Sequence, residues 1–99
     1  MKYMISRDSI VVATQEQVSC DLAGEAVILH LKSGVYYGLD AVGARIWNLI
    51  QTPMNVNNLR DVLLEEYDVD PDRCERDLVA LLQDIAAQGL IEVRNATTA

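Results

Sequence analysis

The stretch that decides the fold is GVYYGLDAVGARIWNLI, residues 34–50. Its opening favours a β-strand that follows a tight Ser33-Gly34 turn and runs from Val35 to Leu39, because Val and Tyr are β-prone. From Asp40 onward the apolar residues recur with helical spacing, and an Asp at this point is a typical helix N-cap. The period changes from two residues to 3.6 within one segment, so we expect the chain to pass directly from a sheet into a helix.

Upstream of this stretch the sequence is β-like. Short β-prone runs occupy residues 10–13, 18–20 and 26–31. The third run is too short for a typical helix and is bounded by Gly-containing turns, so it is expected to form a hairpin with residues 35–39.

Downstream the pattern is helical. Thr52-Pro53 stops the first helix, Asn55 is placed to cap a second, and Asp70-Pro71 opens a third with an N-cap followed by Pro. Gly89 is expected to end the third helix, and residues 90–93 to add a short strand. The elements are segregated rather than alternating, which predicts an α+β fold with a three- to four-stranded antiparallel sheet followed by three helices. The last two helices resemble a helix-turn-helix pair.

Length and charge limit the function. The 99 residues, about half of them apolar, suffice for a single domain, residues 1–99, with its core at about residues 10–93 and a disordered tail at residues 95–99. Eight basic residues stand against 15 acidic ones, for a formal charge of −7. This balance disfavours nucleic acid and anionic membranes as partners.

The remaining features indicate a cytoplasmic protein. No apolar run approaches the roughly 20 residues that a membrane span needs, and residues 1–8 do not resemble a secretory signal. Cys20 and Cys74 form no CxxC pair, and we expect two reduced, buried thiols.

Residues 34–50 resemble the central signature of PqqD-like proteins, the recognition elements of peptide-modification pathways. LLEEYDVDP at residues 63–71, Leu81-Leu82 and Gly89-Leu90-Ile91 are similar to the rest of that pattern, so the likeness covers about residues 18–93. The resemblance implies a winged helix-turn-helix-like fold that lacks catalytic activity. It also implies a partner: the leader peptide of a ribosomally made precursor, which adds as a further strand beside residues 35–39 and packs against the third helix.

The sequence is most similar to the free-standing family members of lasso-peptide pathways, in which a separate cysteine protease removes the leader. Members of the quinone pathway instead present their precursor to a radical-SAM enzyme, and many have a basic or Pro-rich opening that this sequence lacks. The resemblance therefore favours the lasso-type role, with a leader peptidase or another modifying enzyme of the same pathway as second partner.

The expected peptide-binding residues come from two elements. In the strand, alternation places Val35, Tyr37 and Leu39 on one face, and Tyr36 and Gly38 on the other. Leu39 is expected in the core, Tyr37 in the core or the groove, and Tyr36 facing solvent or at a groove rim. Gly38 is expected at a bend into the helix, with a close backbone approach as the alternative. In the third helix the expected residues are Arg73, Arg76, Asp77, Leu78 and Leu81. The charged members of this set are equally consistent with a solvated face, and the leucines with the core.

Nothing in the sequence predicts catalysis, a cofactor or a metal. His30 has no ligand at metal-binding spacing and forms no recognisable set with Cys20, while Trp47 is expected to anchor the core. Two alternatives remain open, namely a winged-helix DNA-binding regulator and a constitutive protein–protein adaptor. The expected recognition helix opens with the net acidic stretch 70–77, which is unlike a groove reader.

Overall fold

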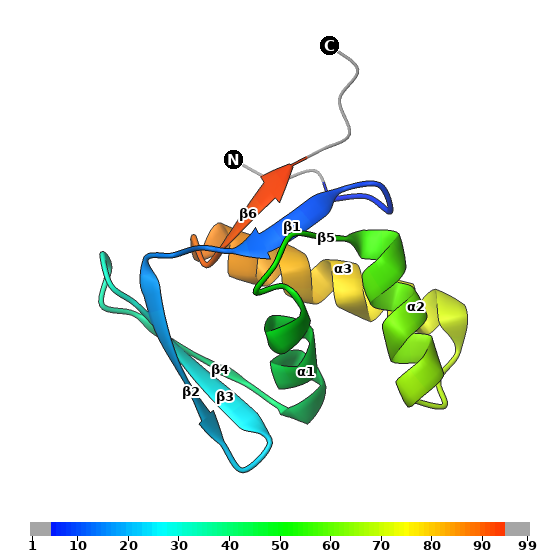
Figure 1. The fold of residues 1–99 in the computed structure, drawn as a ribbon, viewed down its shortest axis with the longest axis horizontal. Coiled ribbons are helices and arrows are strands. Elements are labelled where there is room, and N and C mark those ends of the chain that lie inside the picture. Colours follow the sequence, from blue (N-terminus) through cyan, green and yellow to red (C-terminus); the bar gives the residue numbers. More distant parts are fainter. Residues whose placement is uncertain (1–4, 95–99) are drawn as a thin grey trace.

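The structure, a computed structural model, describes residues 5–94 (Figure 1). The predicted tail at residues 95–99 lies outside them. The strands are β1 (Ile10–Ala13), β2 (Gln17–Leu22), β3 (Glu25–His30), β4 (Tyr36–Leu39), β5 (Met54–Asn55) and β6 (Ile91–Arg94). The helices are α1 (Ala41–Leu49), α2 (Val56–Glu66) and α3 (Pro71–Ala87). The α+β class and the three helices are confirmed.

The strands form two antiparallel sheets rather than the single sheet that the sequence predicted. One has the order β2-β3-β4 and the other β5-β1-β6. In Figure 1 the first sheet extends to the lower left of the helices, whereas the second lies at the top. The second sheet joins both ends of the described chain, because β1 pairs with β6 and with the short β5 between α1 and α2. Two strands therefore follow α1, where the prediction placed only a short tail strand.

The helices begin where the sequence predicted. The Asp40 Oδ1 accepts a hydrogen bond from the Gly43 N–H at 2.8 Å, and the Asp70 Oδ2 accepts one from the Arg73 N–H at 3.0 Å. Asn55 caps α2 in the same way through the Asn57 N–H. These side chains satisfy backbone donors that the first helical turn leaves unpaired. Gly89, with φ of 75°, follows α3 in the left-handed conformation that ends many helices.

The core lies between the helices and the inner faces of the two sheets. Its large, fully buried members include Ile28, Ile50, Leu59, Leu82 and Ile85. Trp47 is 2% exposed and belongs to this cluster, as expected for a core anchor. Helix α3 packs on α2 and β6, and the shared core cluster connects it to Ile28 of β3 and Leu39 of β4.

Two local expectations were wrong. Val35 lies outside β4, because residues 31–35 form a longer connection than the expected two-residue turn, closed by a hydrogen bond from the Gly34 N–H to the His30 carbonyl. The cysteines are free, but Cys20 is exposed and Cys74 only half-buried. Cys20 is exposed because β2 is an edge strand whose outer face no other described element covers.

Candidate functional site

Strand β4 has one free edge. It pairs only with β3 among the described strands, with Tyr36 opposite Leu29 and Tyr37 opposite Ile28. The His30 N–H donates to the Val35 carbonyl at 3.0 Å, in register with this ladder. Hydrogen-bonded and non-bonded pairs alternate in an antiparallel ladder. The backbone groups of Tyr37 therefore point to β3, whereas those of Tyr36 and Gly38 point to the free edge.

One face of β4 packs on the core that α3 shares. Tyr37 on this face is half-buried and packs against the core cluster, which includes Leu82 and Ile85 of α3. Burial raises the pKa of the Tyr37 phenol, and the Asp84 carboxylate in the last turn of α3 raises it further. Tyr36 points the other way and is 69% exposed. The expected placement of the two tyrosines on opposite faces of the strand is confirmed, and Tyr37 lies at the boundary of the core.

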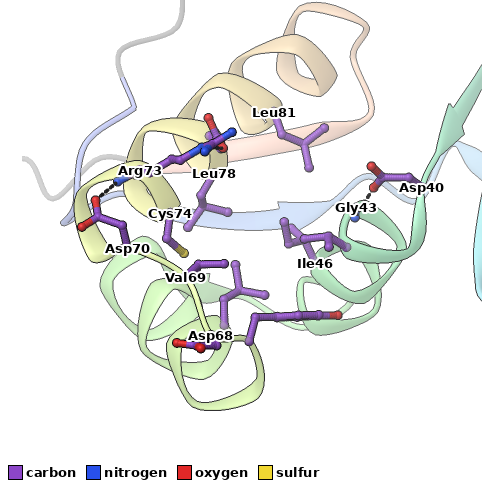
Figure 2. Close-up of a pocket in the computed structure, with 14 residues that line it drawn as sticks. Asp40, Gly43, Ile46, Asp68, Val69, Asp70, Arg73, Cys74, Leu78 and Leu81 are labelled. Atoms are coloured by element: carbon purple, nitrogen blue, oxygen red, sulfur yellow. Dashed lines mark hydrogen bonds and ion pairs between the residues drawn. The ribbon is translucent and has the colours of Figure 1, made fainter.

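A cavity of about 630 Å³ opens where β4 ends and α1 begins. It lies between α1, the end of α2 and the first three turns of α3, within the size range of about 300–1,000 Å³ that is typical of ligand sites. Figure 2 shows side chains from all three helices facing one another across it. Its lining residues are Asp40, Val42, Gly43, Ile46, Leu63, Tyr67, Asp68, Val69, Asp70, Arg73, Cys74, Asp77, Leu78 and Leu81.

The floor of the cavity is apolar. Ile46, Leu63 and Leu78 are almost fully buried and present one side to it. Val42 and Val69 stand at the rim and are 42% and 46% exposed. Apolar area at such a rim is free to be covered by a ligand, at a gain of roughly 25 cal/mol per Å².

Charged side chains surround this floor. We name Asp40, Asp68, Asp70 and Asp77 the mouth carboxylates, and among residues 5–94 the only basic residue lining the cavity is Arg73. The Arg73 Nε lies 3.7 Å from the Asp77 Oδ2, and both side chains are about three-quarters exposed. An exposed pair at this distance contributes little to stability, so these groups are available to a ligand.

A bidentate ion pair fixes the far side of the cavity. Arg45 of α1 donates to Glu66 of α2, from Nε to Oε1 at 2.9 Å and from Nη2 to Oε2 at 2.6 Å. These hydrogen bonds hold the pKa of Glu66 below its usual value. Ile46 and Tyr67 follow directly in the two helices and line the cavity. The pair therefore sets the separation of α1 and α2 at the site.

Cys74 lies within the cavity and has little nucleophilic character. Burial raises the pKa of its thiol, and the carboxylates of Asp77 and Glu75 raise it further, although Arg60 acts in the opposite sense. A raised pKa keeps the thiol protonated. No group of three or more residues suited to hold a metal ion occurs within residues 5–94. The arrangement is suited to binding: a free strand edge leads into an apolar cavity with a charged rim.

The family model described as "Coenzyme PQQ synthesis protein D (PqqD)" matches residues 25–91, about two thirds of the chain. The chain belongs to the PqqD family. Those residues include β3, β4 and all three helices, and so contain both the free edge and the cavity. The family resemblance of residues 34–50 is confirmed. No curated protein sequence matches the chain.

Two solved structures share this PqqD-type fold. "TbiB1 in Complex with the TbiA(beta) Leader Peptide" is 36% identical, with a TM-score of 0.77 over 89% of this chain and 99% of that chain. "Lasso peptide synthetase B1 complexed with the leader peptide" is 23% identical, with a TM-score of 0.73 over 83% of this chain and 96% of that one. The second likeness shows the fold alone.

The structure brings most of the sequence-predicted residues together. Tyr36, Tyr37, Gly38 and Leu39 form β4, and Arg73, Asp77, Leu78 and Leu81 line the cavity. Val35 precedes the strand. Gly38 lies within it, and a Cβ there would meet nothing within 4 Å, so neither a bend nor a close approach within the described chain requires glycine. Their role in peptide binding stays a prediction.

Arg76 does not belong to this site. It lines a second groove on the other side of α3, together with Arg7, Glu75 and Val79. Arg76 lies about 60° around the helix from Arg73 and about 100° from Asp77, on the side that faces the second groove.

Several lining residues escaped prediction, because they come from α1 and from the α2–α3 connection. Val42 and Ile46 at i, i+4 were assigned to the core stripe of α1. Val42 comes soon after the end of β4 in the sequence. This proximity is the signal that could have assigned Val42 and Ile46 to the site. Asp68 and Val69 carry no comparable signal, since a loop follows no fixed period, whereas Tyr67 at the end of α2 continues the helical spacing of Leu59 and Leu63.

Proposed function

We propose that this chain binds the leader segment of a ribosomally synthesised precursor peptide and delivers it to the enzymes that modify or cleave the precursor. In this proposal the leader adds as a fourth strand along the free edge of β4. A side chain beyond the paired segment then occupies the α1–α2–α3 cavity. The chain itself performs no chemistry, and the lasso-type pathway is favoured.

The free edge of β4 is the observation that carries the proposal. Unpaired N–H and C=O groups along an exposed strand invite pairing with another chain unless the fold protects them. Here the backbone groups of Tyr36 and Gly38 face away from β3, and the cavity opens at Asp40, directly after the end of β4. Backbone pairing supplies affinity in such complexes, and adjacent pockets supply sequence preference.

The relatives support the identity of the peptide. TbiB1, which is 36% identical over 89% of this chain, was solved with a leader peptide. The more distant lasso peptide synthetase B1 was also solved with one.

The DNA-binding alternative finds no support at α3. Its N-terminal part presents Asp70, Asp72 and Asp77 along with Arg73, and duplex DNA would be repelled by this surplus of carboxylates. The adaptor alternative requires a strand edge that is permanently filled by a partner enzyme or a second copy of the chain, and sedimentation of the isolated chain distinguishes it from peptide capture.

The proposal is tested by calorimetric titration with the TbiA(beta) leader peptide and with the leader encoded beside this gene. Tyr36→Pro removes an N–H that faces the edge, and we expect the affinity for leader to fall about tenfold or more. Tyr36→Ala is the matched control, because it removes the side chain and keeps the donor. The proposal fails if neither leader binds, or if the two variants bind equally well.

A further inference from the structure

The mouth of the α1–α2–α3 cavity has a strong charge imbalance. Four mouth carboxylates face one guanidinium, and the whole chain carries a formal charge of −7. In Figure 2 the Asp40, Asp68 and Asp70 side chains stand around the apolar side chains of Ile46, Leu78 and Leu81. Asp68, Asp70 and Asp77 lie within the acidic stretch 68–77, and the fold brings Asp40 to them.

These carboxylates can accept further hydrogen bonds or ion pairs from a ligand. Asp40 and Asp70 each give one oxygen to a helix cap and keep their charge. Asp68 is exposed, and its carboxylate makes no hydrogen bond or ion pair among residues 5–94. Asp77 has only its loose contact with Arg73. Arg73 already lies beside Asp77. The charges at the mouth of the cavity therefore remain net negative toward an incoming ligand.

The exposed valines add a second requirement. Val42 and Val69 lie at the rim between the apolar floor and the carboxylates. A Lys or Arg side chain has an aliphatic stem that covers apolar surface and a charged end that reaches beyond it. Such a residue would satisfy both features of the rim. An Asp or Glu would leave the valines uncovered and meet like charges.

We propose that the cavity selects peptides in which a Lys or Arg neighbours the apolar residue seated on the floor, with Asp68 and Asp77 contacting the positive charge. The inference rests on the proposed function, since it assumes that a peptide lies along β4 and enters this cavity. It adds to that function the chemistry by which the leader is distinguished from other extended peptides.

The test is a display selection with a library of random 20-residue peptides that encodes acidic and basic residues at equal frequency. The wild-type chain and the Asp68→Lys/Asp77→Lys variant are used as parallel baits. Tyr36→Pro serves as the bait for counter-selection, so that only peptides dependent on the β4 edge are retained. We expect wild-type binders enriched in Lys or Arg next to an apolar residue, and loss or reversal of that enrichment with the charge-reversed bait.

Single substitutions then assign the contacts. For one selected peptide, Lys→Gln in the peptide and Asp68→Asn or Asp77→Asn in the protein should each weaken binding about two- to fivefold, with double changes less than additive. Glu65→Gln is the matched control, because it removes one exposed charge outside the cavity. Edge-dependent binders without a charge bias, or with an acidic bias, overturn this inference and leave the proposed function standing. Absence of edge-dependent binders overturns both.

Discussion

Helix α3 separates two grooves that differ in how their charges are used. On one side lies the α1–α2–α3 cavity, where Arg73 and Asp77 are 3.7 Å apart and well exposed. On the other lies the groove between α3 and residues 5–8, which we name the N-terminal groove. There Glu75 accepts hydrogen bonds from Arg7 at 2.9 Å and from Arg60 at 2.8 Å, and its side chain is only a quarter exposed.

The difference shows which groove is open to a partner. In the N-terminal groove two guanidinium groups already occupy one carboxylate, and the bonds join the chain start, α2 and α3. In the cavity the carboxylates remain available above an apolar floor. The Arg7–Glu75–Arg60 contacts join parts of the fold to one another, whereas the available charge beside apolar surface in the cavity is free to meet a partner.

The largest expected effect comes from a matched pair of substitutions in α3. Leu81 and Val79 are both half-buried and pack against the core, but they line opposite grooves. Leu81→Gln should reduce leader affinity by about tenfold or more, because a buried apolar contact of this size is worth roughly 1.5–3 kcal/mol. Val79→Gln should leave affinity unchanged, although each variant should lose about 1–2 kcal/mol of folding stability. Titration with the leader measures the affinity, and urea unfolding measures the folding stability. Equal affinity losses in the two variants would contradict the assignment of the two grooves.

A smaller effect is expected from Glu75→Gln, which removes the shared carboxylate of the N-terminal groove. Hydrogen bonds from Arg7 and Arg60 lower the Glu75 pKa from its ordinary value of 4.5. A lowered folded-state pKa gives stability that is present above the ordinary value and is lost as the pH falls through the lowered one. The variant should therefore be less stable near neutral pH and should lose less stability on acidification.

Thermal unfolding between about pH 3 and pH 7, the range over which carboxylates titrate, checks this expectation. Glu65→Gln again supplies the control for removal of one exposed acidic residue. Unchanged stability at neutral pH would mean that the Arg7–Glu75–Arg60 contacts do not stabilise the fold. A change in leader affinity would mean that the two sides of α3 are not independent.

The smallest effect concerns the contact between β4 and α3. Burial and, to a lesser degree, Asp84 raise the Tyr37 pKa. Asp84→Asn should lower this pKa only in part, because burial is the larger cause and persists. Titration of the tyrosine ring followed by NMR measures the change, with Tyr36 as an internal reference. If the Tyr37 pKa did not change in the Asp84→Asn variant, β4 would not lie close to the face of α3 that the proposed groove requires.

Local structure was predictable from the sequence because its causes are local. Asp40, Asn55 and Asp70 each cap a helix through a hydrogen bond within three residues, and the alternation at Tyr36 and Tyr37 follows from strand geometry. The pairing of β1 with β6 was not predictable, because partners some 80 residues apart leave no periodic signal.

The candidate site was predictable only in part for the same reason. The β4 strand and one face of α3 have periods that can be read from the residues. The phase of α3 relative to β4 is set by the core, which is why the sequence does not show that Arg76 lines the groove on the other side of the helix. The cavity also needs residues from α1 and from the α2–α3 connection, and only packing brings these to α3.

The central claim is that a leader peptide pairs with the free edge of β4, and amide hydrogen exchange tests it most directly. Exchange is measured residue by residue, with and without saturating TbiA(beta) leader peptide or the leader encoded beside this gene. The Tyr36 and Gly38 amides face the edge and should exchange much more slowly in the complex, whereas the Tyr37 amide, already paired with β3, should change little. Protection confined to β2 or α2, with Tyr36 and Gly38 unaffected by a bound leader, would contradict the account.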